Sequence, residues 1–125
     1  MTLPARLSRI ATNEARFRDI NDRLEQGLRR MEPTPDDLLE FVCECGHRDC
    51  EQLIEMSFAE YEHVRRDSRQ FAVVPGHAIP DAERIVEVHE RYQVLEKLGG
   101  AVAVADAADS RAPGPLGRRR GDRTS

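Results

Sequence analysis

The three cysteines of this 125-residue chain all lie within eight residues, in the segment Cys43-Glu-Cys45-Gly-His-Arg-Asp-Cys50. Residues two apart on a strand point to the same face, so Cys43 and Cys45 can present both sulfur atoms to one point. Gly46 permits the positive φ that a tight turn needs, and the loop then returns Cys50 toward the other two. This pattern predicts a zinc knuckle, because structural zinc sites combine thiolates with one further sulfur or nitrogen ligand.

The fourth ligand must come from elsewhere, and four histidines are available. We expect His77, because Pro75-Gly76 makes a rigid turn that can aim the imidazole across a sheet. His47 is the main alternative. It lies two residues after Cys45, and the same short turn would have to bring both His47 and Cys50 to one ion, which would strain the backbone. The remaining alternatives are a carboxylate, water, His63 on a solvated helix and His89 in a turn.

Zinc would also contribute to folding. Three thiolates, a neutral imidazole and Zn²⁺ carry a net charge of −1, which Arg48 and the amides of the Gly46 turn are expected to offset. The chain has four Phe, two Tyr and no Trp, so its core depends on Leu, Ile and Val. Zinc supplies on the order of 10 kcal/mol of folding free energy in small zinc peptides, enough to decide whether such a domain folds.

Other uses of the cysteines are weighed against zinc. A structural disulfide is disfavoured by the odd count and by a reducing cytoplasm. A redox switch, in which oxidation joins Cys45 to Cys50 or ejects zinc, fits thiolate chemistry, although the C-x-x-C spacing is missing. Catalysis would need a neighbouring base that nothing local supplies. Buried thiols that only pack are the last alternative.

A helix is predicted over residues 12–31, ending before Pro33. Thr12 or Asn13 is expected to cap it, with Glu14 in its first turn, where the helix dipole favours an anion. Its apolar stripe is expected to pack on the chain's own sheet; the alternative is a partner helix or a homodimer through this helix. The stripe consists of Ile10, Phe17, Ile20, Leu24, Leu28 and Met31.

The middle of the chain predicts short strands. Residues 38–45 alternate between apolar and polar side chains, and residues 51–56 and 71–74 form two further short strands. A capping box, Ser57-Phe-Ala-Glu60, begins a short helix that ends near residue 67. Residues 81–98 fit either a hairpin or a helix, and the hairpin is favoured because helical spacing breaks after residue 92.

These elements predict an α+β fold: an N-terminal helix, a small antiparallel sheet with the zinc knuckle, and a C-terminal tail. Residues 1–100 are expected to form the zinc-stabilised domain. Residues 101–125 are rich in Ala, then in Pro, Gly and Arg, and are expected to be disordered. No secretory signal or membrane-spanning stretch is present in the sequence, which predicts a cytoplasmic protein.

Charge limits the partners. Residues 1–110 carry 14 basic and 22 acidic side chains, a net charge of −8, whereas residues 111–125 carry five Arg and one Asp, a net charge of +4. An acidic body repels a phosphate backbone, so nucleic acid is expected to bind only through the tail. The sequence has no Gly-rich phosphate loop and no G-x-S-x-G or H-E-x-x-H motif. The deaminase motif H-x-E is also missing, because the residue two positions after His77 is Ile79 and not Glu. We therefore expect a non-enzyme.

Three segments resemble a group of short, uncharacterised bacterial proteins typical of GC-rich genomes. The segments are Ala11-Thr-Asn-Glu-Ala-Arg-Phe-Arg-Asp-Ile-Asn-Asp-Arg-Leu24, then Glu40-Phe-Val-Cys-Glu-Cys-Gly46 with Cys50, then Val73-Val-Pro-Gly-His77. The resemblance covers roughly residues 11–98 and carries no activity with it. It implies that the helix, the cysteines and the Pro-Gly-His turn form one unit, which favours His77 as the fourth ligand.

The function predicted from these features is a small zinc-binding module for protein interaction or regulation, with an unidentified protein partner. A zinc-thiolate redox sensor is the alternative, and a nucleic-acid-associated zinc module that uses the basic tail is a further one.

Overall fold

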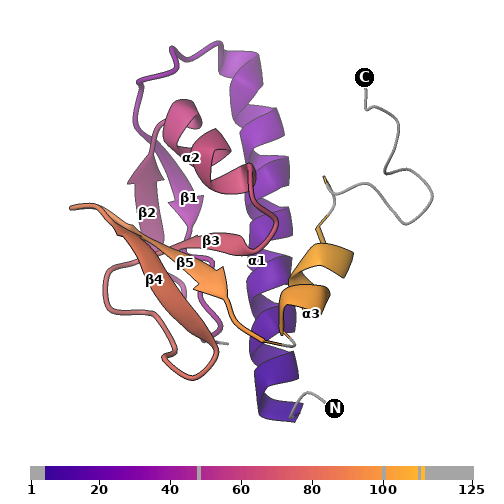
Figure 1. Ribbon diagram of the computed structural model, residues 1–125. Helices are drawn as coiled ribbons and strands as arrows, with labels where there is room; N and C mark the ends of the chain where they lie inside the picture. Colours follow the sequence, from indigo (N-terminus) through magenta and orange to yellow (C-terminus); the bar gives the residue numbers. More distant parts are fainter. Residues whose placement is uncertain (1–4, 48, 100, 110, 112–125) are drawn as a thin grey trace.

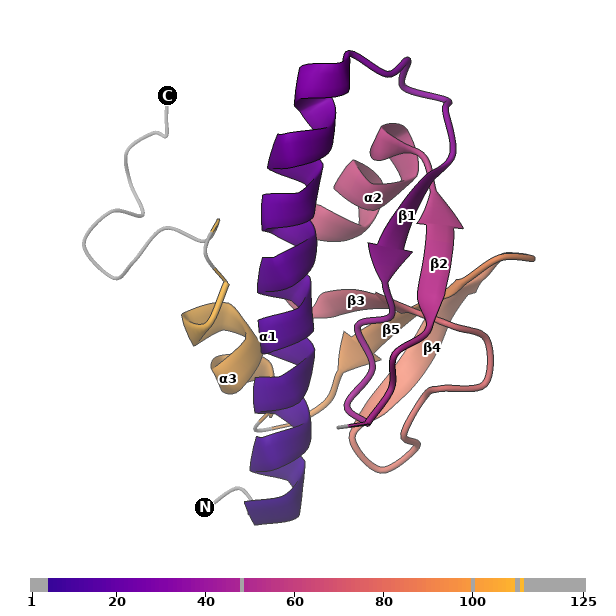
Figure 2. The same cartoon turned by 180° about the vertical axis from the view of Figure 1, so that it is seen from behind.

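A long helix, α1, forms one side of the molecule, and two small antiparallel sheets lie against it (Figures 1 and 2). The computed structural model describes residues 5–47, 49–99, 101–109 and 111. This is the predicted α+β fold. Its elements are α1 (Ala5–Leu28), the 3-10 turn η1 (Arg29–Met31), β1 (Leu39–Val42), β2 (Leu53–Met56), α2 (Phe58–Arg65), β3 (Gln70–Val73), β4 (Glu83–Val88), β5 (Gln93–Lys97) and α3 (Ala101–Ala107).

The strands form two separate sheets. β1 and β2 pair as a hairpin, with Phe41 opposite Ile54, and the second sheet has the order β3-β5-β4. Residues 81–98 form the β4–β5 hairpin, which confirms the favoured alternative over a helix. β4 carries a bulge between Ile85 and Glu87. Within the described residues, no helix is both long and apolar enough to cross a membrane.

The main core lies where the β1–β2 hairpin, α2 and β5 meet. The rings of Phe41 and Tyr61 stack with their centroids 4.6 Å apart. The predicted capping box is confirmed: Glu60 N–H donates to the Ser57 hydroxyl, and Ser57 N–H donates to the Glu60 carboxylate. The buried members of this core are Phe41, Ile54, Met56, Phe58, Tyr61, Val64, Ala72, Tyr92 and Val94.

Helix α1 differs from the prediction in its start and in its buried face. It is already helical at Ala5, so Thr12 and Asn13 are not caps and Glu14 does not lie in the first turn. The apolar stripe packs only in part on the chain's own core, since the side chains of Ile20 and Met31 are 41% and 76% exposed. The buried face instead includes polar side chains, whose partners come from other elements of the fold. These are Glu14, Arg18, Asn21, Asp22 and Glu25.

The buried charges of α1 find partners far away in the sequence. Lys97 of β5 donates hydrogen bonds to Glu14 and, at 2.9 Å, to Glu83. All three side chains are fully buried. Burial raises the pKa of Glu14 to about 9, and the neighbouring Glu83 carboxyl adds to the shift. One ammonium thus faces two carboxyl groups, of which Glu14 keeps its proton at neutral pH.

The buried carboxyl groups predict how stability depends on pH. A Glu14 side chain with a pKa near 4.5 when unfolded and about 9 when folded binds more protons in the folded chain between these values. Stability from this group is therefore expected to fall as pH rises through that window, by at most about 1.4 kcal/mol per pH unit. Urea unfolding at about pH 5, 7 and 9 should show a shallower decline for Glu14→Gln than for the parent. Glu40→Gln, at an exposed position of β1, serves as the control. Equal slopes for Glu14→Gln and the parent would contradict the assignment.

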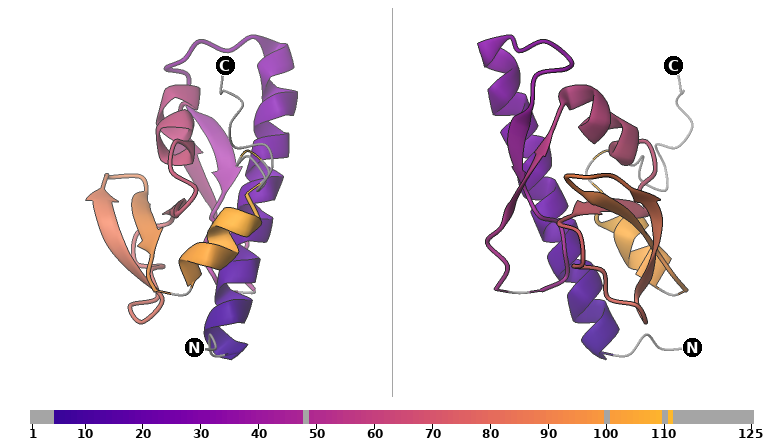
Figure 3. Two further views of the ribbon diagram at one scale, coloured as in Figure 1. Left: turned by 45° about the vertical axis from the view of Figure 1, so that its right-hand side comes forward. Right: turned by 90° about the vertical axis from the view of Figure 1, so that its left-hand side faces the viewer.

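The predicted disorder of residues 101–125 is wrong for its first part. Residues Ala101–Ala107 form α3, which packs beside α1 (Figure 3). Arg18 of α1 donates to the Ala105 carbonyl at 2.9 Å, and Arg65 of α2 donates to Asp109 at 2.5 and 3.1 Å. Alanine is the best helix former, and its small side chain permits the close approach of two helices. Residues 112–125, the rest of the expected tail, lie outside the described residues.

Candidate metal centre

The four predicted ligands come together at one point. The ligand atoms of Cys43, Cys45, Cys50 and His77 all lie within 4.8 Å of one another. The sulfurs of Cys43 and Cys50 lie 3.6 and 3.7 Å from Nδ1 of His77. We call these residues the Cys3His group. Such a group can hold a metal ion.

The β1–β2 hairpin delivers the three sulfurs. Cys43 follows β1 directly and extends the pairing, since its N–H donates to the Gln52 carbonyl at 3.0 Å. The connecting loop then closes through a hydrogen bond from Cys50 N–H to the His47 carbonyl at 3.2 Å. Two cysteines therefore start the loop, and the third returns to them at its end.

The turn after β3 delivers the nitrogen. Gly76 has a φ of 91°, a conformation that glycine adopts without strain. His77 N–H donates to the Val74 carbonyl at 3.0 Å and closes the turn around Pro75. The predicted Pro-Gly turn thus places an imidazole from the three-stranded sheet against the sulfurs of the hairpin.

Gly46 is needed for a different reason from the one predicted. Its φ is not positive. A Cβ atom at this position would lie 2.4 Å from Cγ2 of Ile10 and 3.2 Å from Cδ1 of Ile79. The cysteine loop therefore passes so close to α1 that a side chain larger than hydrogen has no room.

The separation of the donor atoms fits zinc. Ligand bonds of about 2.3 Å to sulfur and 2.0–2.1 Å to nitrogen, arranged as a tetrahedron, place sulfur and nitrogen about 3.5–3.6 Å apart. The two measured sulfur–nitrogen distances are 3.6 and 3.7 Å. These two pairs already stand at the separation that one ion requires, and the widest donor pair, within 4.8 Å, would close to about 3.8 Å around it.

Backbone amides supply part of the positive charge that three thiolates require. Val74 N–H donates to the Cys43 sulfur at 3.2 Å. A hydrogen bond from the Cys43 thiol, followed by others that include the His77 ring and the His47 amide, lowers the pKa of Cys45 to about 5. The amide of residue 47 thus acts as predicted for the Gly46 turn. Arg48, the other predicted source of positive charge, lies outside the described residues.

The second nitrogen of His77 also has a partner. Its Nε2 lies 3.4 Å from the side-chain amide of Gln52. A metal at Nδ1 leaves the proton on Nε2. The nearest Gln52 atom is the amide nitrogen, so a 180° turn of that amide would bring its oxygen into place to accept the Nε2–H. Histidine ligands in metal sites are commonly oriented by such a second hydrogen bond. Nothing in the sequence singles out Gln52 except its place two residues after Cys50.

The other histidines do not join the group. The exposed His47 ring lies edge-on to that of His77, with 5.7 Å between centroids, but it is not part of the Cys3His group. His63 and His89 each lie 2.8 Å from the Glu87 carboxylate, at the other end of the β4–β5 hairpin. Among the histidines, only His77 therefore places a ring nitrogen with the three sulfurs.

Two further residues fix the site, and sequence reasoning missed both. Glu44, between two of the ligands, was expected on a polar face but is fully buried. Its N–H donates to the Ala72 carbonyl at 2.8 Å, and its carboxylate accepts from Ala72 N–H at 3.0 Å. Asn21 of α1 donates to the same carboxylate at 2.7 Å and exchanges two 2.8 Å hydrogen bonds with the backbone of Val42. The cysteine loop is thereby held against both α1 and β3.

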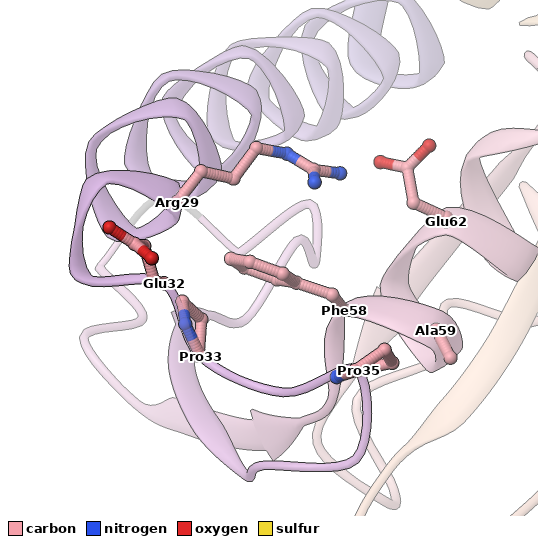
Figure 4. Close-up of a pocket in the computed structure, with 7 residues that line it drawn as sticks. All are labelled: Arg29, Glu32, Pro33, Pro35, Phe58, Ala59 and Glu62. Carbon is pink, nitrogen blue, oxygen red and sulfur yellow. The ribbon is translucent and has the colours of Figure 1, made fainter.

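A pocket elsewhere in the structure has no part in this group. It has a volume of about 330 Å³ and lies between the end of α1, the loop that follows it and the start of α2 (Figure 4). The Arg29 guanidinium lies 4.7 Å from the centre of the Phe58 ring at this pocket. Neither cysteine nor histidine lines it, so the Cys3His group is the candidate site.

The fold and the site define a small α+β protein with a Cys3His group that can bind a metal ion. No family model, curated protein or solved structure matches the chain. The resemblance to short bacterial proteins is therefore still a prediction, and the proposals below depend on this chain's own residues.

Proposed function

We propose that the chain is a small zinc-binding module in which the metal joins the β1–β2 hairpin to the three-stranded sheet. The observation that supports this proposal is the convergence of three sulfurs and one imidazole nitrogen within 4.8 Å. Thiolate and imidazole ligands in a tetrahedral arrangement favour zinc over the hard cations Mg²⁺ and Ca²⁺, which prefer oxygen.

The number of ligands supports a structural role. Four protein ligands complete the tetrahedron, whereas catalytic zinc sites keep one position for water or substrate. Two of the sulfurs, those of Cys43 and Cys45, belong to buried residues, which limits access further. We therefore propose a non-enzymatic module.

The partner is proposed to be a protein. Several large apolar side chains are exposed, among them Ile20 on α1, Leu53 on β2 and Val88 on β4. A rigid module with such positions suits an interaction or regulatory adaptor, whose shape the metal maintains.

Metal analysis of purified variants tests the proposal. The parent is expected to contain one zinc per chain. Cys45→Ser and His77→Ala should each lower the affinity for zinc at least tenfold, because each removes one of four ligands. His47→Ala is the matched control, since it removes a neighbouring imidazole from outside the group. Full zinc content in His77→Ala together with loss in His47→Ala would refute the assignment of the fourth ligand.

A zinc-thiolate redox sensor is the second candidate, and the exposure of one ligand favours it. Cys50 is only half-buried, whereas the other two cysteines are buried. Peroxide would oxidise two thiolates to one disulfide, be reduced to water and release the ion. A sensor should release zinc from the folded protein on peroxide treatment and recover it after reduction. A structural site should keep its zinc until the chain unfolds, and zinc release measured beside circular dichroism separates the two.

A further inference from the structure

The free edges of three strands are closed by side chains and, on β3, also by the backbone N–H of Glu44. Asn21 exchanges two hydrogen bonds with the backbone of Val42 on the outer edge of β1. Arg91 donates to the Glu55 carbonyl on β2 at 2.5 Å, and Glu44 pairs with both backbone groups of Ala72 on β3. These contacts use backbone groups that could otherwise pair with the strand of another chain.

The outer edge of β4 is open from Ile85 to Val88, whereas at Glu83 the backbone N–H already donates to the Ile79 carbonyl at 3.1 Å. In the left view of Figure 3, β4 lies at the margin of the molecule, with β5 on its inner side. Alternation in an antiparallel ladder directs the backbone groups of Ile85 and Val88 away from β5. Within the described part of the chain, no hydrogen bond outside the ladder reaches these two backbones. Their side chains are also 45% and 72% exposed.

The side chains of β4 complement those of a second β4 running in the opposite direction. The bulge between Ile85 and Glu87 places Arg84 and Glu87 on one face, because their partners on β5 are residues 96 and 94, two positions apart. When two copies pair about a two-fold axis between Ile85 and Val86, Arg84 lies opposite Glu87 of the partner subunit. The same pair forms a second time across the axis.

We propose that the chain forms a two-fold dimer in which the β4 edges of two copies pair antiparallel and join the two three-stranded sheets into one. Arg84 is 64% exposed, and its Nε and Nη2 donate to Glu96 at 3.0 and 2.7 Å, which leaves Nη1 for a second carboxylate. Glu87 is partly exposed at this edge, with its carboxylate oxygens 2.8 Å from ring nitrogens of His63 and His89. Hydrogen bonds from His89 and His63 hold the pKa of Glu87 below its usual range, so it offers a carboxylate to the guanidinium of a second copy. β4 contains neither proline nor lysine, the residues that commonly blunt exposed edges.

The dimer is expected to be weak. A six-residue strand buries less surface than the roughly 1,200–2,000 Å² of a stable interface. The dissociation constant is therefore expected on the order of 10–100 µM, and sedimentation equilibrium over about 1–500 µM covers this range.

Charge reversal provides the test. Arg84→Glu and Glu87→Arg, studied separately, place like charges opposite each other at both pairs and should raise the dissociation constant at least about tenfold. In an equimolar mixture of the two variants, every pair across the axis is again of opposite charge, so a heterodimer should form with nearly the parent's affinity. Arg23→Glu, on the exposed surface of α1, is the control and should dimerise as the parent does.

Each outcome decides the proposal. Circular dichroism first establishes that every variant is folded. A parent that stays monomeric throughout the series overturns the proposal, as does a dimer that both single reversals leave unchanged. A dimer that Ile20→Glu disrupts and the β4 variants do not would overturn it in favour of an interface on α1. A mixture that fails to recover association would likewise overturn the charge-paired register.

Discussion

Removal of zinc is expected to unfold the protein or to lower its unfolding midpoint by more than about 20 °C. The metal would contribute on the order of 10 kcal/mol, as in zinc peptides, whereas the whole stability of a small domain is about 5–15 kcal/mol. The Cys3His group joins the hairpin to the turn after β3. Without the ion, no bond joins the three cysteines of the hairpin to the imidazole of the other sheet.

Thermal unfolding with and without an excess of chelator, followed by circular dichroism under reducing conditions, measures this effect. His47→Ala serves as the matched control and should respond to the chelator as the parent does. Re-addition of zinc should restore the midpoint. An unchanged midpoint in protein shown to be free of metal would contradict a structural role for the ion.

Deletion of residues 101–125 is expected to destabilise the chain by at least 3–5 kcal/mol, or about 12 °C or more in the unfolding midpoint. The Arg65 side chain is fully buried between Asp22 and Asp109. Loss of Asp109 leaves that guanidinium with one carboxylate in place of two. Arg18, also buried, loses its hydrogen bond to the Ala105 carbonyl.

A chain that ends after Arg111 separates this effect from any role of the remaining residues. It retains α3, the contacts of Asp109 and the pairing of Arg111 with Glu25 and Glu62, both at 2.9 Å. Its midpoint is expected to match that of the full chain within a few degrees. Asp109→Ala in the full-length chain should reproduce much of the loss. If deletion from residue 101 left the midpoint unchanged, the buried network would contribute nothing.

Local chemistry made much of the site predictable. Cys43 and Cys45 lie two residues apart just after β1, Cys50 is a short loop away, and Pro75-Gly76 allows one turn that presents His77. The capping box at Ser57 and the β4–β5 hairpin were also predictable, because short-range spacing specifies each of them.

The errors came from contacts that spacing does not reveal. Glu14 and Arg18 were not expected inside the protein, because their partners, Lys97 and the Ala105 carbonyl, are more than eighty residues away. The α3 helix was predicted as disordered because an Ala-rich segment has little apolar surface of its own, and its packing on α1 is a tertiary effect. The role of Glu44 was not predicted, because it depends on Ala72 of β3, a strand from another part of the chain.

The partners of α1 also set the order in which the protein can be made. This helix is synthesised before the residues that pair with its buried side chains, namely Arg65, Lys97 and Ala105. A nascent chain therefore exposes unmatched charges on α1 until Ala105 has emerged. Pairing between such distant residues slows folding in small domains.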